Sequence, residues 1–326
     1  MQAVDVQALS TGAVFDMHRR SEHLCALAGG VAPMQRMLDV IEDIWLEHDG
    51  LSLHCELHPV HGQAKAIIVF QPGSGAHARL YFLLGGLLAR HGYRLLAIDR
   101  PGHGLSGGTR GDGTIGEAIA VTQCVVEHAR GRFDLPVVLM GSSLGGLLTV
   151  FALLRGLRPD LAVAHNFVYP GKLLSMRLRA RWIARHRHRP YPLTELVHDF
   201  ERLSDDPAVV NYLRERSDPG AAWALSVRSV ASLFAFRAPA PAEAPPTLVL
   251  TGSADKAIPS WATRFFMGWS GLPGYEVQVL RGAGHLLFHD HLDMTLPILV
   301  AWLDEKLAGM SGDAETTRPT PTRSGA

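Results

Sequence analysis

Cysteines and long apolar runs are scarce in this sequence. Its 326 residues include three cysteines, Cys25, Cys55 and Cys124, whose odd number and spacing fit neither a disulfide framework nor a CxxC metal site. This usage predicts a reducing, cytoplasmic environment. Residues 1–30 lack the basic and apolar regions of a signal peptide, and no run reaches the roughly 18 apolar residues of a membrane-spanning helix. We therefore expect neither secretion nor stable membrane insertion.

An excess of either charge is also missing. The 31 lysines and arginines balance the 31 aspartates and glutamates, so the formal net charge is zero. Such a chain has no long-range field to attract nucleic acid, and we expect no nucleic-acid partner. The composition is 47% hydrophobic and 19% charged, which supplies enough apolar material for a large folded core.

Most of the chain alternates short apolar runs with helical patterns. An antiparallel hairpin is predicted over residues 44–58, because two alternating runs meet at Asp49-Gly50, a pair that favours the positive φ angles of a tight turn. The later runs are typical of parallel strands that are buried on both faces and connected by helices. They cover residues 66–70, 93–98, 136–140, 162–168, 247–251 and 275–280.

These strands define a core with one interruption. The core covers residues 44–168 and 247–308. Between its two parts, residues 169–246 carry an arginine-rich run and polar helical patterns, and they end in a proline-rich return. This interruption predicts an inserted helical cap.

The two ends of the chain lie outside this core. Residues 1–43 form an N-terminal arm whose structure the sequence does not predict beyond one helix over residues 33–44, where apolar residues follow helical spacing. Residues 309–326 have almost nothing to bury. We expect them to be a disordered tail.

A serine stands in a turn between a predicted strand and a predicted helix. The sequence Gly-Ser-Ser-Leu-Gly at 141–145 follows the run at 136–140 and precedes an apolar helical segment. This is the context of a nucleophile elbow, in which two glycines leave room for a strained turn that exposes the serine hydroxyl. The pentapeptide pattern alone arises by chance in about one such chain in five. Its place between strand and helix makes Ser143 the candidate nucleophile.

A serine nucleophile needs a base, and the base needs an acid to orient it. Asp255 follows the run at 247–251, and His285 follows the run at 275–280. Taken singly, Asp255 fits a turn or helix cap, and His285 is one of 17 histidines. Serine, aspartate and histidine in this order, each beyond the end of a parallel strand, predict a catalytic triad.

With these residues in place, the chain resembles the α/β-hydrolase superfamily, specifically its monoacylglycerol lipase and lysophospholipase branch. The likeness covers about residues 44–307. It includes Pro72-Gly-Ser-Gly-Ala-His77, which resembles the oxyanion loop, and Asp99-Arg-Pro-Gly-His-Gly, which resembles the motif after the fourth strand. The resemblance implies an α/β-hydrolase fold: a mostly parallel eight-stranded sheet with helices on both faces and an inserted helical cap.

The same resemblance implies the oxyanion hole, formed by the backbone N–H groups of Ser74 and Leu144. At two positions this sequence differs from the usual residues of the branch, which limits the properties that can be inferred from the resemblance. Members of the branch usually carry His-Gly where this chain has Pro72-Gly73, and many have histidine where it has Ser142. We therefore transfer the reaction type and not the substrate.

Triad and resemblance together predict a serine hydrolase that cleaves a small-molecule acyl ester and needs no metal or organic cofactor. A thioesterase or acyltransferase would use the same triad and differ in its pocket and acceptor. A carbon–carbon bond hydrolase of the same fold is less favoured. A non-catalytic ligand-binding scaffold of this fold is the alternative outside enzymology, although such a binder would not need all three residues.

The other histidines and the arginines of the cap each allow a functional and a structural interpretation. Four histidines near the hairpin (His48, His54, His58 and His61) suggest a metal cluster, but no carboxylate or cysteine spacing completes it, and solvent-facing side chains are the favoured reading. His77 and His103 lie in loops near the predicted pocket and are expected to line it or to be hydrogen-bonded loop residues. The arginines of the cap fit a transient contact with an anionic membrane surface or, more simply, a solvated helix face.

Overall fold

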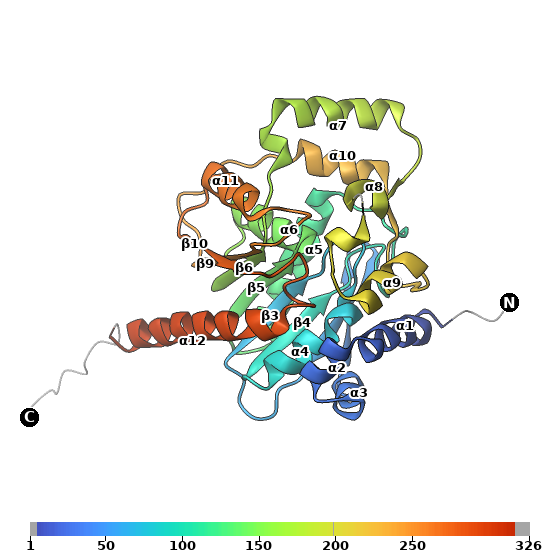
Figure 1. Cartoon of the computed structure of the whole chain (residues 1–326). Helices are drawn as coiled ribbons and strands as arrows, with labels where there is room; N and C mark the ends of the chain where they lie inside the picture. Colours follow the sequence, from blue (N-terminus) through green and yellow to red (C-terminus); the bar gives the residue numbers. More distant parts are fainter. Residues whose placement is uncertain (1–4, 198, 317–326) are drawn as a thin grey trace, which may run out of the picture.

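One eight-stranded sheet forms the centre of the molecule (Figure 1). The computed structural model describes residues 5–197 and 199–316, the side chains of 311–316 excepted. The strands are β1 (Glu42–His48), β2 (Leu51–His58), β3 (Ala66–Gln71), β4 (Tyr93–Ile98), β5 (Val137–Ser142), β6 (Leu161–His165), β9 (Thr247–Gly252) and β10 (Tyr275–Leu280). Their order is β1-β2-β4-β3-β5-β6-β9-β10. The pairs β1–β2 and β2–β4 are antiparallel and all others are parallel, which confirms the predicted fold class.

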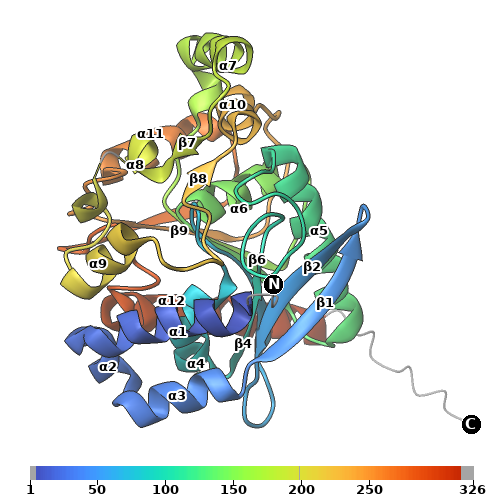
Figure 2. The ribbon, with the colours of Figure 1, turned by 90° about the vertical axis from the view of Figure 1, so that its right-hand side faces the viewer.

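The hairpin at the start of the sheet turns where the sequence predicts. Asp49 and Gly50 have φ angles of 49° and 74°, the left-handed values that a two-residue hairpin turn of this kind requires. Glu42 pairs with Leu57 and His48 with Leu51, so the register runs without a break along the hairpin. Figure 2 shows β1 and β2 at the edge of the molecule.

Helices cover both faces of the sheet. Successive strand residues point to opposite faces, so each buried strand has apolar side chains on both faces that the helices cover. On β3, Ile68 and Phe70 belong to one apolar cluster, and Ile67 and Val69 belong to the other. The first cluster packs under α4 (Phe82–Ala89), α12 (Leu292–Thr316) and the N-terminal helices. The helices on the opposite face are α5 (Ile115–Arg132), α6 (Leu144–Leu154) and α11 (Ser260–Ser270).

The N-terminal arm is helical. It contains α1 (Val6–Arg20), α2 (Glu22–Ala28) and α3 (Val31–Asp39). The helix expected over residues 33–44 ends earlier, at Asp39, because residues from Glu42 onward pair with β2 as β1. Pairing with β2 satisfies the backbone polar groups of these residues in place of another helical turn. Figure 2 shows the arm along one side of the molecule, with α1 next to α9 (Pro207–Glu215), a helix of the cap segment.

Residues 169–246, which we call the cap segment, lie between β6 and β9 in the chain. They contain η2 (Pro170–Lys172), α7 (Leu174–His186), β7 (Tyr191–Pro192), α8 (Leu193–Val197), η3 (Phe200–Arg202), α9, β8 (Ala224–Leu225) and α10 (Val227–Ala235). Ile183, Tyr191, Phe200 and Val230 belong to a small apolar cluster within the segment. In Figure 1, α7 and α10 lie at the top of the molecule, beyond the helices that cover the sheet.

The C-terminal helix is longer than the sequence predicts. We expected a disordered tail from residue 309, but α12 continues through Gly309 to Thr316. Extending an established helix adds one hydrogen bond per residue without a new nucleation step, which offsets the low helix propensity of Gly309 and Gly312. The rest of the expected tail, residues 317–326, lies outside the described residues.

Candidate active site

Ser143 lies in a sharp turn between β5 and α6. Its φ and ψ angles are 52° and −115°, a strained region for a residue with a side chain. The neighbouring glycines make the turn sterically feasible. A Cβ atom at Gly145 would overlap the carbonyl oxygen of Gln71, and one at Gly141 would overlap that of Gly145. The G-x-S-x-G pattern is therefore required by close backbone packing around the serine.

The structure brings Ser143, His285 and Asp255 together from three loops. Asp255 follows β9 and His285 follows β10, and parallel neighbours place both loops at the same edge of the sheet as the turn after β5. His285 Nε2 lies 3.0 Å from Ser143 Oγ, and His285 Nδ1 lies 2.9 Å from Asp255 Oδ2. A nucleophile, a base and an orienting acid in this geometry can pass a proton from serine to histidine.

Asp255 is buried and held by several donors. Its Oδ1 accepts hydrogen bonds from the backbone N–H groups of Ala257 and Ile258, both at 2.8 Å. Its Oδ2 accepts one from Asn166 Nδ2 at 3.1 Å, besides facing His285. Burial opposes ionisation, but the hydrogen bond and charge of His285 and the Ile258 N–H outweigh it and lower the pKa of Asp255. The carboxylate is therefore ionised and fixed in position at neutral pH.

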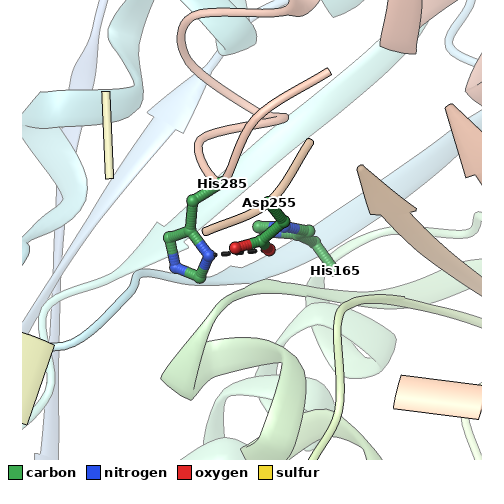
Figure 3. A group of neighbouring side chains, drawn as sticks. All are labelled: His165, Asp255 and His285. Atoms are coloured by element: carbon green, nitrogen blue, oxygen red, sulfur yellow. Dashed lines mark hydrogen bonds and ion pairs between the residues drawn. The ribbon is translucent and has the colours of Figure 1, made fainter. Parts of the chain in front are cut away.

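His165 and Asn166, at the end of β6, also lie next to Asp255. Neither was predicted from the sequence as a site residue. Figure 3 shows His165 beside Asp255 and His285, with 5.3 Å between the two imidazole ring centres. Burial and the nearby charge of His285 lower the pKa of His165 to about 3, so it stays neutral. Asn166 has a left-handed φ angle of 43°, and its side-chain amide donates to Asp255. Their place directly at the carboxyl end of a parallel strand was the available signal.

The loop that carries Ser74 is held by buried polar groups. Arg100 Nη1 and Nη2 donate to the carbonyl oxygens of Pro72 and Gly73 at 2.5 and 2.7 Å. The Tyr81 hydroxyl accepts the Gly73 N–H at 3.2 Å. This loop therefore has an arginine for support at the place where Pro72 departs from the usual histidine.

Leu144 is the other residue assigned to the oxyanion hole. It is the first residue of α6, so its N–H has no acceptor within the helix. Both Ser74 and Leu144 lie next to the cavity beside Ser143. Two N–H groups on either side of a serine hydroxyl can stabilise negative charge on a carbonyl oxygen.

Two cavities meet at Ser143. The larger, about 280 Å³, lies between α6 and the cap segment, and the smaller, about 110 Å³, lies between η1 (Ala78–Tyr81), α1 and the cap segment. Both are lined by Ser74, Ser143 and Val197. The cap segment contributes further apolar side chains to the larger cavity, namely Leu196, Leu225, Val230, Leu233 and Phe234. Apolar walls with a few polar groups near the candidate nucleophile suit an acyl compound.

The two loop histidines have different places. His103 lines the larger cavity, and its Nδ1 lies 3.1 Å from the Pro101 carbonyl oxygen. Burial and the charge of Arg100 lower its pKa to about 3. His77 lines neither of the two cavities at Ser143. Its Nε2 faces Asp218 Oδ2 at 2.8 Å, and this buried ion pair connects the loop after Ser74 to the cap segment. His77 is therefore the hydrogen-bonded loop residue of the two alternatives, and the pocket-lining alternative is wrong for the cavities at Ser143.

Two of the four histidines near the hairpin are placed differently from the solvent-facing prediction, whereas His61 is exposed as predicted and His48 is partly exposed. His54 and His58 are buried, with 0% and 1% of their surface exposed, and are not solvent-facing. His54 Nδ1 faces Asp99 at 2.7 Å and Nε2 faces Asp43 at 2.9 Å, so polar partners explain its burial. Within residues 5–197 and 199–316, two groups place potential ligand atoms within 4.8 Å of one another: His165, Asp255 and His285, and Asp43, His54 and Glu56. In each group a histidine already faces a carboxylate as a hydrogen-bond partner.

Known proteins are similar to this chain in both sequence and fold. The family model "Serine aminopeptidase, S33" matches residues 62–291. Monoglyceride lipase of Mus musculus is 23% identical over 292 residues, covering 80% of this chain and 89% of that protein. The crystal structure of Paleococcus ferrophilus monoacylglycerol lipase has a TM-score of 0.63 and 25% identity, covering 78% of this chain and 99% of that one.

A soluble variant of Saccharomyces cerevisiae monoglyceride lipase has the same fold, with a TM-score of 0.66 and 17% identity over 82% of this chain and 96% of that one. The family model covers more than half of the chain, so it shows the family without support from these relatives of low sequence identity. This protein is a lipase- or esterase-type α/β-hydrolase of the monoacylglycerol lipase-like branch, and it belongs to the serine aminopeptidase S33 family.

Proposed function

We propose that this protein hydrolyses carboxylic esters of lipid-like or small acyl compounds through Ser143, His285 and Asp255. The observation that carries the proposal is the continuous chain of hydrogen bonds from Ser143 Oγ through His285 to Asp255, at the point where two apolar cavities meet. The relatives named monoglyceride lipase favour an oxygen ester over a thioester.

The proposed reaction has two halves. Ser143 Oγ attacks the acyl carbonyl while His285 Nε2 takes its proton, and Asp255 keeps the imidazole oriented and stabilises its positive charge. The backbone N–H groups of Ser74 and Leu144 bind the oxyanion. His285 then returns the proton to the leaving oxygen as the carbon–oxygen bond breaks. Water, activated by His285, releases the acyl group from Ser143 in the second half. Side chains and backbone of this chain supply every group, so we propose no metal or cofactor.

A fluorophosphonate probe tests this proposal, because it reacts covalently with an activated serine. The expected result is one modified peptide, carrying the probe on Ser143, in the wild type and in the control Ser175→Ala, an exposed position on α7. Ser143→Ala should not be labelled. Hydrolysis of an oxygen ester and of a thioester with the same acyl group then separates an esterase from a thioesterase. Labelling of the Ser143→Ala variant at the wild-type rate would contradict the proposal.

We also propose that the cap segment touches an anionic membrane surface through α7. Leu174, Leu178 and Trp182 recur every four residues on this helix and are 61%, 53% and 60% exposed. Four arginines and no acidic residue accompany this apolar stripe, which complements an anionic lipid surface. No helix among the described residues is long and apolar enough to cross a bilayer.

Vesicle sedimentation tests this contact. Wild-type protein should sediment with vesicles containing phosphatidylserine and much less with phosphatidylcholine alone. Leu178→Glu should abolish the binding, whereas Ala184→Glu should weaken it less, because it adds the same charge at an exposed position of α7 that faces away from the stripe. Equal binding by both variants would exclude the stripe as the contact.

We further propose a cytoplasmic location. Cys25, Cys55 and Cys124 are all free thiols. Cys55 is buried, and burial together with the charge of Asp99 raises the pKa of its thiol well above the usual value. Such a thiol is unreactive and suits a reducing compartment.

A further inference from the structure

The N-terminal arm reaches the candidate active site. It precedes the segment matched by the family model, which begins at residue 62, yet Met17 on α1 lines the smaller cavity together with Ser143 and His285. Met17 is 3% exposed, so its side chain packs into the wall of this cavity and does not project into solvent.

Contacts on both sides of Met17 fix α1 to the cap segment. Ser21 Oγ donates a hydrogen bond to Asp206 at the start of α9. Ser10 Oγ lies 3.4 Å from His77 Nε2, whose other partner is Asp218. Helix α1 also packs along α9. The arm is therefore held in place as part of the cavity wall.

The two cavities differ in whether His285 lines them, and this difference indicates which part of the ester each cavity binds. His285 must give its proton to the leaving oxygen, so that oxygen lies within hydrogen-bond reach of His285 Nε2. The smaller cavity is lined by His285, whereas the larger one is not. Both contain Ser74 and Ser143, as an acyl carbonyl at the junction requires. The leaving alcohol then occupies the smaller cavity, and the acyl chain occupies the larger.

We infer that Met17 of the N-terminal arm determines which leaving alcohol this enzyme accepts, and that the preferred alcohol is small and apolar. The inference rests on the proposed ester hydrolysis. The cavity of about 110 Å³ limits the size of the alcohol. Apolar side chains that line this cavity together with Met17, including Leu80, Val209 and Leu213, favour an alkyl or aryl group.

Two ester series test the inference with the full chain. In the first, butyrate is esterified to ethanol, butanol or hexanol; in the second, p-nitrophenol is esterified to C4, C8 or C12 acids. The quantity compared is the ratio of kcat/KM values within one variant, so the fraction of folded protein cancels. Because kcat/KM includes the acylation step, it reports on the leaving group as well as on the acyl chain.

Met17→Ala should raise the preference for the longer alcohols, by roughly fourfold for each methylene that enters the vacated space, which corresponds to about 0.8 kcal/mol per buried methylene. The ranking of acyl lengths should stay unchanged. Met17→Leu, which leaves a side chain of similar volume in the cavity wall, should keep the wild-type ranking of alcohols. The matched control is Met34→Ala, the same change at a fully buried methionine of α3 that lines neither cavity; it should alter neither ranking.

Two outcomes would overturn the inference. One is an unchanged alcohol ranking in Met17→Ala, and the other is a changed acyl ranking with the alcohol ranking intact. Both presuppose that the wild type hydrolyses esters, which distinguishes them from failure of the proposed function. A wild type that hydrolyses neither series and does not react with the fluorophosphonate would contradict the proposed function, and this inference with it.

Discussion

The guanidinium group of Arg100 donates hydrogen bonds to the two successive carbonyl oxygens of Pro72 and Gly73, immediately before Ser74. Arg100 is only 5% exposed. Burial lowers its pKa to about 10, and the charge of Asp99 opposes this shift, so Arg100 stays charged at neutral pH. A buried charge that donates to two successive carbonyl oxygens of one loop fixes that loop strongly.

Arg100→Lys should therefore displace the Ser74 N–H and reduce transition-state stabilisation. Loss of one oxyanion-hole donor costs about 10²–10³-fold in kcat, and a displaced donor should cost about tenfold or more. Steady-state kinetics on p-nitrophenyl butyrate should show this loss mainly in kcat. The matched control is Arg110→Lys, because Arg110 donates to carbonyl oxygens of other residues, Gly104 and Gly220 among them. A similar kcat loss in both variants would argue against a specific role for Arg100.

The cap segment should determine the acyl length. Leu233 lines the larger cavity, so Leu233→Ala should shift the preference from C4 toward C12 p-nitrophenyl esters, by roughly fourfold per methylene accommodated. Ile183 is buried within the cap segment and lines neither cavity. Ile183→Ala should lower the melting temperature and leave the ranking unchanged. If Leu233→Ala instead lowers the activity on esters of all acyl lengths equally, Leu233 contributes to stability and not to acyl-length selection.

The His54 network predicts a pH-dependent stability. Burial alone would lower the pKa of His54, but the hydrogen bonds to Asp99 and Asp43 and the charges of Asp99 and Glu56 raise it to about 9. An unfolded chain has a histidine pKa near 6.5, so the folded state binds the proton more tightly. This stabilisation is complete below pH 6.5 or so and is lost as pH rises through about 9.

Thermal melts between pH 6 and 10 measure this effect. The melting temperature of the wild type should decline over the alkaline half of this range. His54→Gln should be less stable at pH 6 and should decline less steeply. Parallel declines in both proteins would show that His54 does not carry the effect.

Chelators test whether the reaction uses side chains alone. Dialysis against EDTA should leave kcat/KM unchanged, because His285 and His54 are engaged with carboxylates as hydrogen-bond partners. Activity lost on dialysis and restored by zinc would direct attention to the two groups in which ligand atoms lie within 4.8 Å.

The sequence predicts those parts of this protein that depend on local patterns. Buried parallel strands appear as short apolar runs, and the turn at Asp49 and Gly50 requires residues that tolerate positive φ. The order of Ser143, Asp255 and His285 along the chain was sufficient to expect them at one edge of the sheet, where the structure brings them together.

Other features depend on contacts between distant segments. His54 and His58 look like solvent-facing strand residues, but Asp99 and Asp43 provide buried partners for His54. His77 lies only three residues beyond Ser74, yet its partner Asp218 is 141 positions away. Nothing in the local pattern of Met17 distinguishes a cavity wall from a core position, because both select the same apolar side chain. Such roles follow from packing of the arm and the cap segment around the core.

Ser143 is the nucleophile of the proposed reaction. The most direct test of this role is the hydrolysis of p-nitrophenyl butyrate by wild type and Ser143→Ala, together with the melting temperature of each. Because the substitution removes one hydroxyl from a turn formed by the surrounding glycines, the melting temperature should change little while kcat falls by roughly 10³-fold or more. A folded Ser143→Ala variant that hydrolyses the ester at nearly the wild-type rate would exclude Ser143 as the nucleophile.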